Sequence, residues 1–245
     1  MSGYDDKTEI LTEKGWVFFK DLTLDDKIAT LINGEELLYE NPLCIKESYY
    51  TGKMYLVETS NVNLCMTPNN NVWISYKNGI FEFTTVDEIY SKKVKYQKHI
   101  IKYLDKNTKI FYKILLQCGK DHNLNRFKTN KVLEIMAKTG QPHLMYHNIL
   151  IELSKTNQYS DKNISDHFQR LALHTGLSMN IKYMENDVCK LEVISKNKVI
   201  VNKIYQEDKW INYSGKIYTC QVSSGVIYLR RNGIPIFSGV EINLL

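Results

Sequence analysis

The chain has 245 residues and a formal net charge of +5; 43% of its residues are hydrophobic and 24% are charged. This length and composition are ordinary for a globular protein with a sizeable core, as one large domain or two small ones. No apolar run reaches the length of a transmembrane helix, and the opening Met-Ser-Gly-Tyr-Asp-Asp lacks the pattern of a secretory signal. We therefore expect a soluble, intracellular protein that makes no contact with membranes.

Cysteine and histidine usage limits the chemistry. The cysteines are widely spaced, with no Cys-x-x-Cys pair: Cys44, Cys65, Cys118, Cys189 and Cys220. We expect reduced thiols, with Cys65 and Cys220 as small buried residues, rather than disulfides or a zinc site. His143 and His147 have i,i+4 spacing but no third ligand. The sequence therefore predicts no metal and no other cofactor.

Residues 1–84 have the pattern of short strands separated by turns, which is typical of an all-β domain. Asn33-Gly34 is a strong hairpin signal, because a tight turn of this kind needs two residues with positive φ. Gly52-Lys53 is expected to form a second turn. The predicted strands are Thr8–Thr12, Trp16–Phe19, Lys27–Leu31, Leu37–Tyr39, Met54–Thr59 and Val62–Thr67.

Residues 85–203 change in character and predict a mixed α+β insert with its own small core. Thr85 and Glu88 have the spacing of a capping box, which opens a short helix. Ser165 is expected to cap a longer helix, which Gly176 ends in a left-handed conformation. We expect His174, beside the apolar face of this helix, at the surface.

The β pattern returns in residues 204–245, where Asn232-Gly233 is another hairpin signal. The run Tyr-Ser-Gly-Lys-Ile-Tyr at 213–218 repeats Tyr-Thr-Gly-Lys-Met-Tyr at 50–55. A motif used once near each end indicates that the two ends fold together as related halves of one β unit. The middle of the chain is then an insertion between these halves.

Four segments resemble inteins, and they occur in the intein order. They are Tyr-Asp-Asp-Lys-Thr-Glu-Ile-Leu-Thr-Glu-Lys-Gly-Trp at 4–16, Leu-Cys-Met-Thr-Pro-Asn-Asn at 64–70, Asp-His-Phe-Gln-Arg-Leu-Ala-Leu-His-Thr-Gly-Leu-Ser at 166–178 and Gly-Val-Ile-Tyr-Leu-Arg-Arg-Asn-Gly-Ile-Pro-Ile-Phe-Ser-Gly at 225–239. The third is similar to a helix of intein-borne LAGLIDADG homing endonucleases. The resemblance implies a mainly β fold, the Hint-type horseshoe of two pseudo-symmetric halves, interrupted by a degenerate endonuclease-like insert.

The same resemblance assigns the splicing roles. In inteins a first-residue Cys or Ser attacks the preceding carbonyl, a Thr-x-x-His motif polarises and protonates that amide, and a terminal Asn cyclises. The corresponding positions here are Gly3, Thr67, Asn70, Thr219, Gly239 and Val240. Thr67 keeps the family residue, and Gly239 matches inteins that lack the usual penultimate His.

The other positions are substituted. Gly3 has no side chain to attack with, the amide of Asn70 cannot carry a proton at neutral pH, and Val240 cannot cyclise. Thr219 stands where a Cys or Asp often assists. General acid–base help is worth about 10²–10⁴-fold per group. We therefore expect an intein-like domain that does not splice, is not an enzyme, and persists as a structural or interaction module.

If the chain is embedded in a host protein, its partners are the flanking host (extein) segments. Two alternatives to a silent module remain open, an active enzyme and a DNA-binding protein. An active enzyme of the same descent is either a homing endonuclease, with Asp121 or Glu152 as metal ligands, or a self-cleaving domain that uses Ser2 or Cys220. A DNA-binding remnant would instead act through a lysine-rich segment, and its binding would weaken steeply with salt. The lysines of that segment are Lys92, Lys93, Lys95 and Lys98.

Overall fold

The computed structural model describes residues 1–76, 79–100, 159–160, 162–186, 188–194, 199–201 and 207–241. The chain divides into two compact units. The first unit combines both ends of the chain, residues 1–99 and 196–245, and the second comprises residues 100–195.

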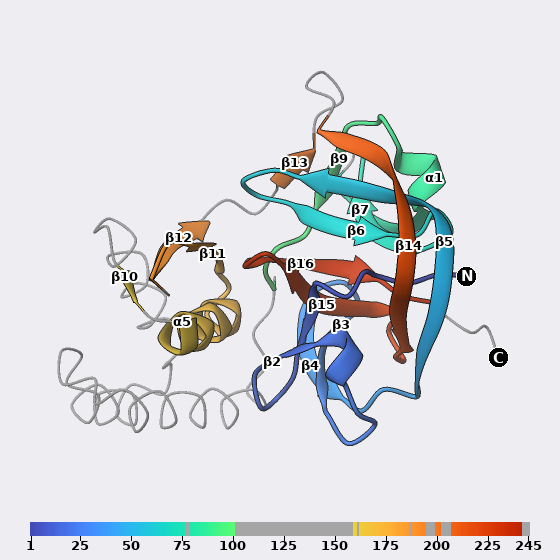
Figure 1. Ribbon diagram of the computed structural model, residues 1–245. Helices are drawn as coiled ribbons and strands as arrows, with labels where there is room; N and C mark the ends of the chain where they lie inside the picture. The colour runs from blue at the N-terminus through green and yellow to red at the C-terminus, as the bar shows by residue number, and fades with distance from the viewer. Residues whose placement is uncertain are drawn as a thin grey trace, which may run out of the picture. The chain divides into compact units, whose positions relative to one another are not determined.

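Strands dominate the first unit, as the sequence predicts (Figure 1). Its elements are β1 (Thr8–Leu11), β2 (Trp16–Phe18), the 3-10 helix η1 (Phe19–Asp21), β3 (Ile28–Ile32), β4 (Glu36–Glu40), β5 (Cys44–Glu58), β6 (Asn63–Met66), β7 (Asn71–Ser75), β8 (Phe81–Thr85), α1 (Val86–Ile89), β9 (Val94–Tyr96), β13 (Val199–Val201), β14 (Asp208–Gln221), β15 (Val226–Arg231) and β16 (Ile234–Gly239). All of its strand pairs are antiparallel. The fold class is therefore mainly β. The α1, β9 and β13 segments, which we expected in the insert, belong to this unit.

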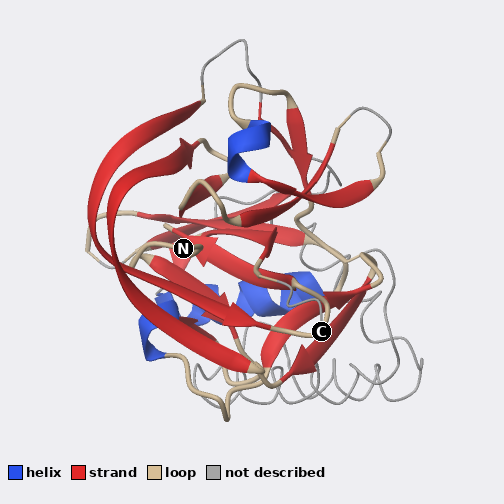
Figure 2. Cartoon of the chain, turned by 90° about the vertical axis from the view of Figure 1, so that its right-hand side faces the viewer, coloured by secondary structure: helices blue, strands red, loops and turns tan. Residues whose placement is uncertain are grey.

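The two copies of the repeated motif lie side by side in the long strands β5 and β14 (Figures 1 and 2). Tyr50 pairs with Gly215, and Tyr213 pairs with Gly52, so the two repeats pair with each other in antiparallel orientation. Each tyrosine hydroxyl donates to the carbonyl three residues along its own strand, over 2.9 Å for Tyr50 and 2.7 Å for Tyr213. The two ends of the chain therefore pair with each other along these strands, as the repeat predicts.

The prediction of a turn at Gly52-Lys53 is wrong, because β5 continues through these residues without a break. The glycines serve close packing instead. A Cβ atom on Gly52 would lie 2.7 Å from the hydroxyl oxygen of Tyr50, and one on Gly215 would lie 3.0 Å from that of Tyr213. Each glycine therefore leaves room for the tyrosine two residues earlier, which lies on the same face of the strand.

One sheet brings the two ends of the chain together. Its strand order is β2-β1-β15-β3-β4, with β16 also paired to β15, so a strand near the C-terminus lies between two N-terminal strands. Every residue of β1 and β15 is buried. The predicted hairpin turns are confirmed, since φ is positive at both Asn33-Gly34 (51° and 71°) and Asn232-Gly233 (49° and 76°).

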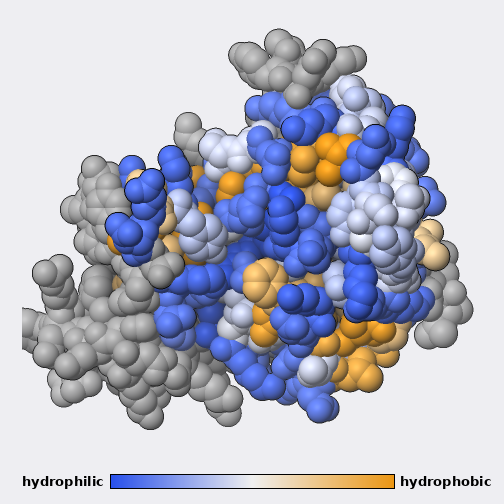
Figure 3. Space-filling model, in the orientation of Figure 1, coloured by the Kyte–Doolittle hydropathy of each residue, from blue (hydrophilic) through white to orange (hydrophobic). Residues whose placement is uncertain are grey.

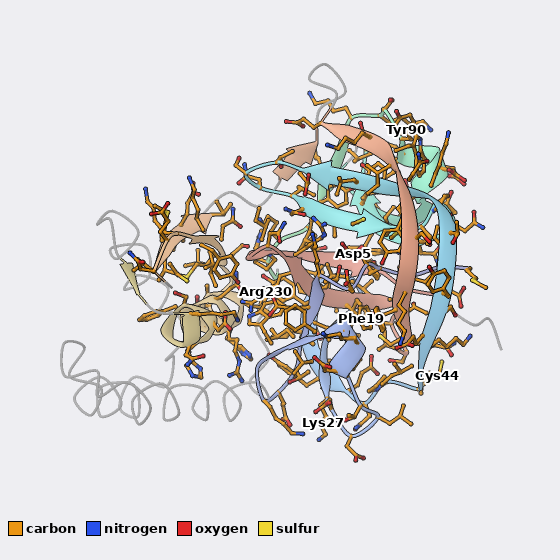
Figure 4. All side chains as sticks on the ribbon, in the orientation of Figure 1. Asp5, Phe19, Lys27, Cys44, Tyr90 and Arg230 are labelled. Carbon is orange, nitrogen blue, oxygen red and sulfur yellow. The ribbon has the colours of Figure 1, made fainter. Side chains whose placement is uncertain are left out.

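Two buried arginines of β15 hold the N-terminal segment. Arg230 forms an ion pair with Glu9 at 2.6 Å, and Arg231 forms one with Asp5 at 2.9 Å. Figure 4 labels one member of each pair, Arg230 and Asp5. Both arginines directly precede the Asn232-Gly233 turn, and they are 0% and 5% exposed. Buried charges need such partners, because removal from water is costly for an unpaired ion.

The capping box at the start of α1 does not form. Thr85 is the N-cap, as predicted, but its side chain makes no capping hydrogen bond. Glu88 instead accepts a hydrogen bond from the hydroxyl of Thr84, over 2.7 Å. The short helix therefore begins at the predicted residue without the predicted contact.

The second unit contains β10 (Tyr159–Ser160), α5 (Lys162–His174), β11 (Ser178–Tyr183) and β12 (Cys189–Ile194). Gly176 ends α5 with φ of 77°, and Leu177 donates to the carbonyl of Ala172 over 2.8 Å, so the predicted left-handed end is confirmed. Ser165 does not cap the helix, because α5 already begins at Lys162.

His174 is fully buried, contrary to our expectation of a surface position. Its helix is exposed only near the start, since every residue from Phe168 to Thr175 is buried. Burial lowers the pKa of His174 to about 3, with a smaller contribution from the charge of Arg170. This histidine is therefore neutral across the physiological range.

The face drawn in Figure 3 is largely hydrophilic, with an apolar area beside the start of β5, where Leu43 is 67% exposed. A small area of this kind is common in globular proteins. Among the described residues, no helix is long and apolar enough to cross a membrane.

Candidate functional site

The segments around Gly3 and around Gly239 meet at the loop that follows β6. Tyr4 brings the first segment there, because it forms isolated β-bridges to both Met66 and Tyr218. Strand β16 brings the second segment there through its pairing with β15. The loop between them contains Thr67 and Asn70, which are both fully buried. We call these three segments the junction site.

Gly3 and Thr67 are joined by two hydrogen bonds. The amide of Gly3 donates to the hydroxyl oxygen of Thr67, and the amide of Thr67 donates to the carbonyl of Gly3, each over 3.0 Å. A Cβ atom on Gly3 would lie 3.1 Å from the carbonyl oxygen of Tyr218 and 3.2 Å from the side chain of Ile217. Any side chain at position 3 would therefore have to displace β14 slightly.

Asn70 contacts the other segment instead. Its side-chain amide donates to the carbonyl oxygens of Asn71 and Gly239, over 2.8 and 3.2 Å. Its own carbonyl oxygen is buried with no hydrogen-bond partner among the described residues. Asn70 therefore links the loop to the Gly239 carbonyl as a hydrogen-bond donor.

Tyr4 is the site residue that sequence reasoning missed. Its hydroxyl donates to the carbonyl of Gly239 over 2.6 Å, and the hydroxyl oxygens of Tyr4 and Ser238 are 2.8 Å apart. Tyr4 is fully buried, and burial raises its pKa above that of an ordinary tyrosine. The phenol therefore stays protonated and acts as a donor. Its place in the intein-like opening run was the only sequence signal.

Val240 is buried and fixed at both of its backbone groups. Its amide donates to the carbonyl of Gly225 over 2.9 Å, and its carbonyl accepts from the side chain of Asn71 over 3.3 Å. The neighbouring Gly239 packs directly on the Asn71 backbone, where an added Cβ would lie 2.9 Å from the carbonyl carbon and oxygen. The hydrocarbon side chain of Val240 offers no reactive group.

Side chains beyond the two glycines also link the segments. Ser2 donates to the carboxylate of Glu241 over 2.8 Å, and Lys46 lies 3.9 Å from the second oxygen of that carboxylate. Both charged side chains of this pair are about half exposed. The pair therefore contributes little stability, since solvent screens it.

The remaining candidate residues near β14 carry no activated nucleophile. Thr219 is buried, and its hydroxyl has no hydrogen-bond partner among the described residues. Cys65 and Cys220 are each 1% exposed, as predicted. Burial raises the pKa of Cys65 to about 12 and also raises that of Cys220. Both stay as thiols rather than the nucleophilic thiolate.

The lysine segment is only partly at the surface. Lys92 and Lys93 are exposed and Lys95 is half-buried, but Lys98 is fully buried and donates to the carbonyl of Asn61 over 2.7 Å. Lys98 is therefore not available to a nucleic acid.

The other expectations concern cysteines, metals and the endonuclease residues. All the described cysteines are free. No cluster of three or more metal-binding side chains occurs in the described part of the chain. Cys118, Asp121, His143, His147 and Glu152 lie outside the described residues.

No family model matches the chain. Two curated algal proteins are similar in sequence. The ATP-dependent Clp protease proteolytic subunit of Chlamydomonas moewusii is 27% identical over 219 residues, which are 86% of this chain and 20% of that protein. The DNA-directed RNA polymerase subunit beta C-terminal section of Stigeoclonium helveticum is 33% identical over 78 residues, 31% of this chain and 7% of that protein. The chain thus spans about a fifth of the first relative.

The solved structures to which the chain is similar include inteins. The AceL NrdHF class 3 split intein, a splice-inactive variant, has a TM-score of 0.44 at 11% identity, covering 98% of this chain and 99% of that one. The KlbA intein precursor of Methanococcus jannaschii has a TM-score of 0.44 at 11% identity, covering 100% and 94%. The bacterial intein-like domain of Clostridium thermocellum has a TM-score of 0.42 at 9% identity, covering 96% and 98%.

Proposed function

We propose that this chain is an intein-like Hint domain that keeps the arrangement of a splice site, no longer splices, and serves as a structural or interaction module. The observation that carries this proposal is the junction site. There the amide of Gly3 is held by Thr67 and the carbonyl of Gly239 by Asn70, over 3.0 and 3.2 Å. Splicing chemistry needs its two reaction points close together, and the contacts of both segments with one loop support this proposal.

The loss of chemistry follows from the side chains at those points. An acyl shift at the Ser2–Gly3 bond needs a thiol or hydroxyl on residue 3, and Gly3 has none. Release at the other end needs a carboxamide on residue 240, and Val240 has a hydrocarbon side chain. Asn70 cannot supply a proton at neutral pH. Loss of the acid alone costs about 10²–10⁴-fold, and without a nucleophile the acyl shift has no attacking atom.

The paired repeats in β5 and β14 support the two-halved ancestry. The match of Tyr50 with Gly215, and of Tyr213 with Gly52, is what two related halves facing each other would produce. The second unit is then the insert, which we propose descends from an endonuclease. The extent of the Clp protease match, 86% of this chain but 20% of that protein, supports an ancestor embedded in a longer host protein.

Splicing activity can be tested directly. The chain is expressed between two reporter proteins, and the products are separated and weighed by mass spectrometry. We expect only the intact three-part precursor. Ligated reporters would refute the loss of splicing, and the same precursor carrying Thr67→Ala would then show whether the junction site is responsible.

A further inference from the structure

The carbonyl oxygen of Gly239 receives two side-chain donors from distant parts of the chain. The hydroxyl of Tyr4 lies 2.6 Å away and the amide nitrogen of Asn70 lies 3.2 Å away. Both donors are fully buried, so water does not compete with them. The phenol has one hydrogen, and the carbonyl oxygen takes it, because that oxygen can only accept.

The nitrogen side of the same peptide group is also fixed. The amide of Val240 donates to the carbonyl of Gly225 over 2.9 Å. When the peptide bond breaks, the nitrogen of Val240 gains a proton and becomes an amine. The carbonyl oxygen of Gly225 beside it stabilises the positive charge that this proton brings. Donors on the oxygen and an acceptor on the nitrogen thus surround one peptide bond, Gly239–Val240.

Asn70 is held in position at the Gly239 carbonyl by a further contact. Its side-chain amide also donates to the carbonyl of Asn71 over 2.8 Å. A donor that is fixed in this way needs no reorganisation when charge develops on the carbonyl oxygen that it contacts. The amide nitrogen of the same side chain meets the Gly239 carbonyl.

We propose that Tyr4 and Asn70 form an oxyanion site on Gly239, which prepares the Gly239–Val240 bond for acyl transfer to a nucleophile at position 240. Two preorganised donors on one carbonyl oxygen stabilise the negative charge that develops there when the carbonyl carbon is attacked. The bond is stable in this chain because the valine side chain has no nucleophilic atom. The activity is therefore latent, and its substrate is the chain's own peptide bond.

Replacing Val240 by cysteine supplies the missing atom. The introduced sulfur attacks the carbonyl carbon of Gly239 and forms a thioester, while the bond from that carbon to the nitrogen of residue 240 breaks. The thiol proton moves to that nitrogen, which becomes a free amine. Added hydroxylamine then attacks the thioester, leaves a hydroxamate on Gly239 and releases residues 240–245 with a free thiol.

The experiment incubates the full-length Val240→Cys chain with hydroxylamine and follows both products by mass spectrometry. We expect a hydroxamate at Gly239, and none from Val240→Ala. Adding Tyr4→Phe to Val240→Cys removes one donor, and we expect cleavage to slow by about 10²–10³-fold, the usual effect of losing one oxyanion donor. Ser238→Ala is the matched control, because it contacts the Tyr4 hydroxyl but donates nothing to the carbonyl, and it should change the rate little.

Circular dichroism on each variant checks that the chain is folded. A folded Val240→Cys chain that yields no hydroxamate overturns the inference, and so does a rate that Tyr4→Phe leaves unchanged. The inference rests on the geometry at Gly239 and goes beyond the loss of splicing. The two proposals can fail separately. Ligation of reporters by the wild-type chain would refute the proposed loss of splicing, but it would not change the outcome of the hydroxylamine experiment on Val240→Cys.

Discussion

Arg230 and Glu9 form a two-point ion pair, in which Nε and Nη2 of the arginine donate to the two carboxylate oxygens over 2.6 and 2.7 Å. The arginine lies on β15 and the glutamate on β1, so the pair joins segments 221 residues apart. The guanidinium also lies over the ring of Trp16, with its central carbon 4.5 Å from the ring centre. The pair couples the two ends of the chain where their strands meet.

Removing one partner of this pair should destabilise the protein strongly. We expect Arg230→Met to lower the free energy of unfolding by about 3–5 kcal/mol, because the Glu9 carboxylate is then buried without its partner. Lys216→Ala, which removes the exposed pair with Glu47, should change the free energy of unfolding little, because solvent screens that pair. Urea unfolding curves at neutral pH measure both effects. The double variant Glu9→Leu/Arg230→Met should recover most of the loss, and failure to do so would mean that the ion pair is not the cause.

The buried His174 should make stability depend on pH. Its pKa is about 3 in the folded chain and about 6.5 when unfolded, so the unfolded chain binds more protons between these values. The free energy of unfolding therefore falls as the pH falls through this window, by roughly 2 kcal/mol from pH 7 to pH 5. Urea unfolding at both pH values measures the change. His174→Gln should remove this part of the dependence, and an unchanged dependence would contradict the assignment.

Local signals predicted the parts of the fold that local chemistry decides. Asn33-Gly34 and Asn232-Gly233 form the expected turns because the residues in the turn set its geometry. The sequence predicted a turn at Gly52, but Gly52 lies inside a continuous strand. A glycine is needed there because the side chain of Tyr50 packs over it and leaves no room for a Cβ atom. His174 was misplaced because every residue in the second half of the helix is buried, so a position beside the apolar face is not a position at the surface.

The sequence predicted only those residues of the junction site that the resemblance to inteins names. Thr67 and Asn70 were named from their motif, but their partners were not. The contact of Tyr4 with Gly239 joins residues 235 positions apart, and no spacing rule in the sequence connects them. Such contacts depend on how the strands pair, and they become visible only in the folded chain.

Substitution at Gly239 should test how closely the C-terminal segment packs on the loop. An added Cβ would lie 2.9 Å from backbone atoms of Asn71, which cannot move aside easily. We expect Gly239→Ala to cost about 1–3 kcal/mol, the usual effect of overpacking. Gly52→Ala is the control, since its nearest atom, 2.7 Å away, is the end of the Tyr50 side chain, which can rotate. Thermal unfolding compares the two, and an equal or larger loss for Gly52→Ala would contradict this view of the packing.

Restoring a carboxamide at position 240 should test whether the site can still release a segment. In a chain followed by a reporter protein, we expect Val240→Asn to detach the reporter slowly. The introduced side-chain nitrogen can attack its own carbonyl, and Asn71 already donates to that carbonyl oxygen over 3.3 Å. Mass spectrometry should detect a cyclic imide at residue 240 and a free amine on Glu241. Adding Asn71→Ala should slow the release, whereas Val240→Leu should release nothing. A folded Val240→Asn chain that stays intact would mean that the site has lost its geometry as well as its reactive groups.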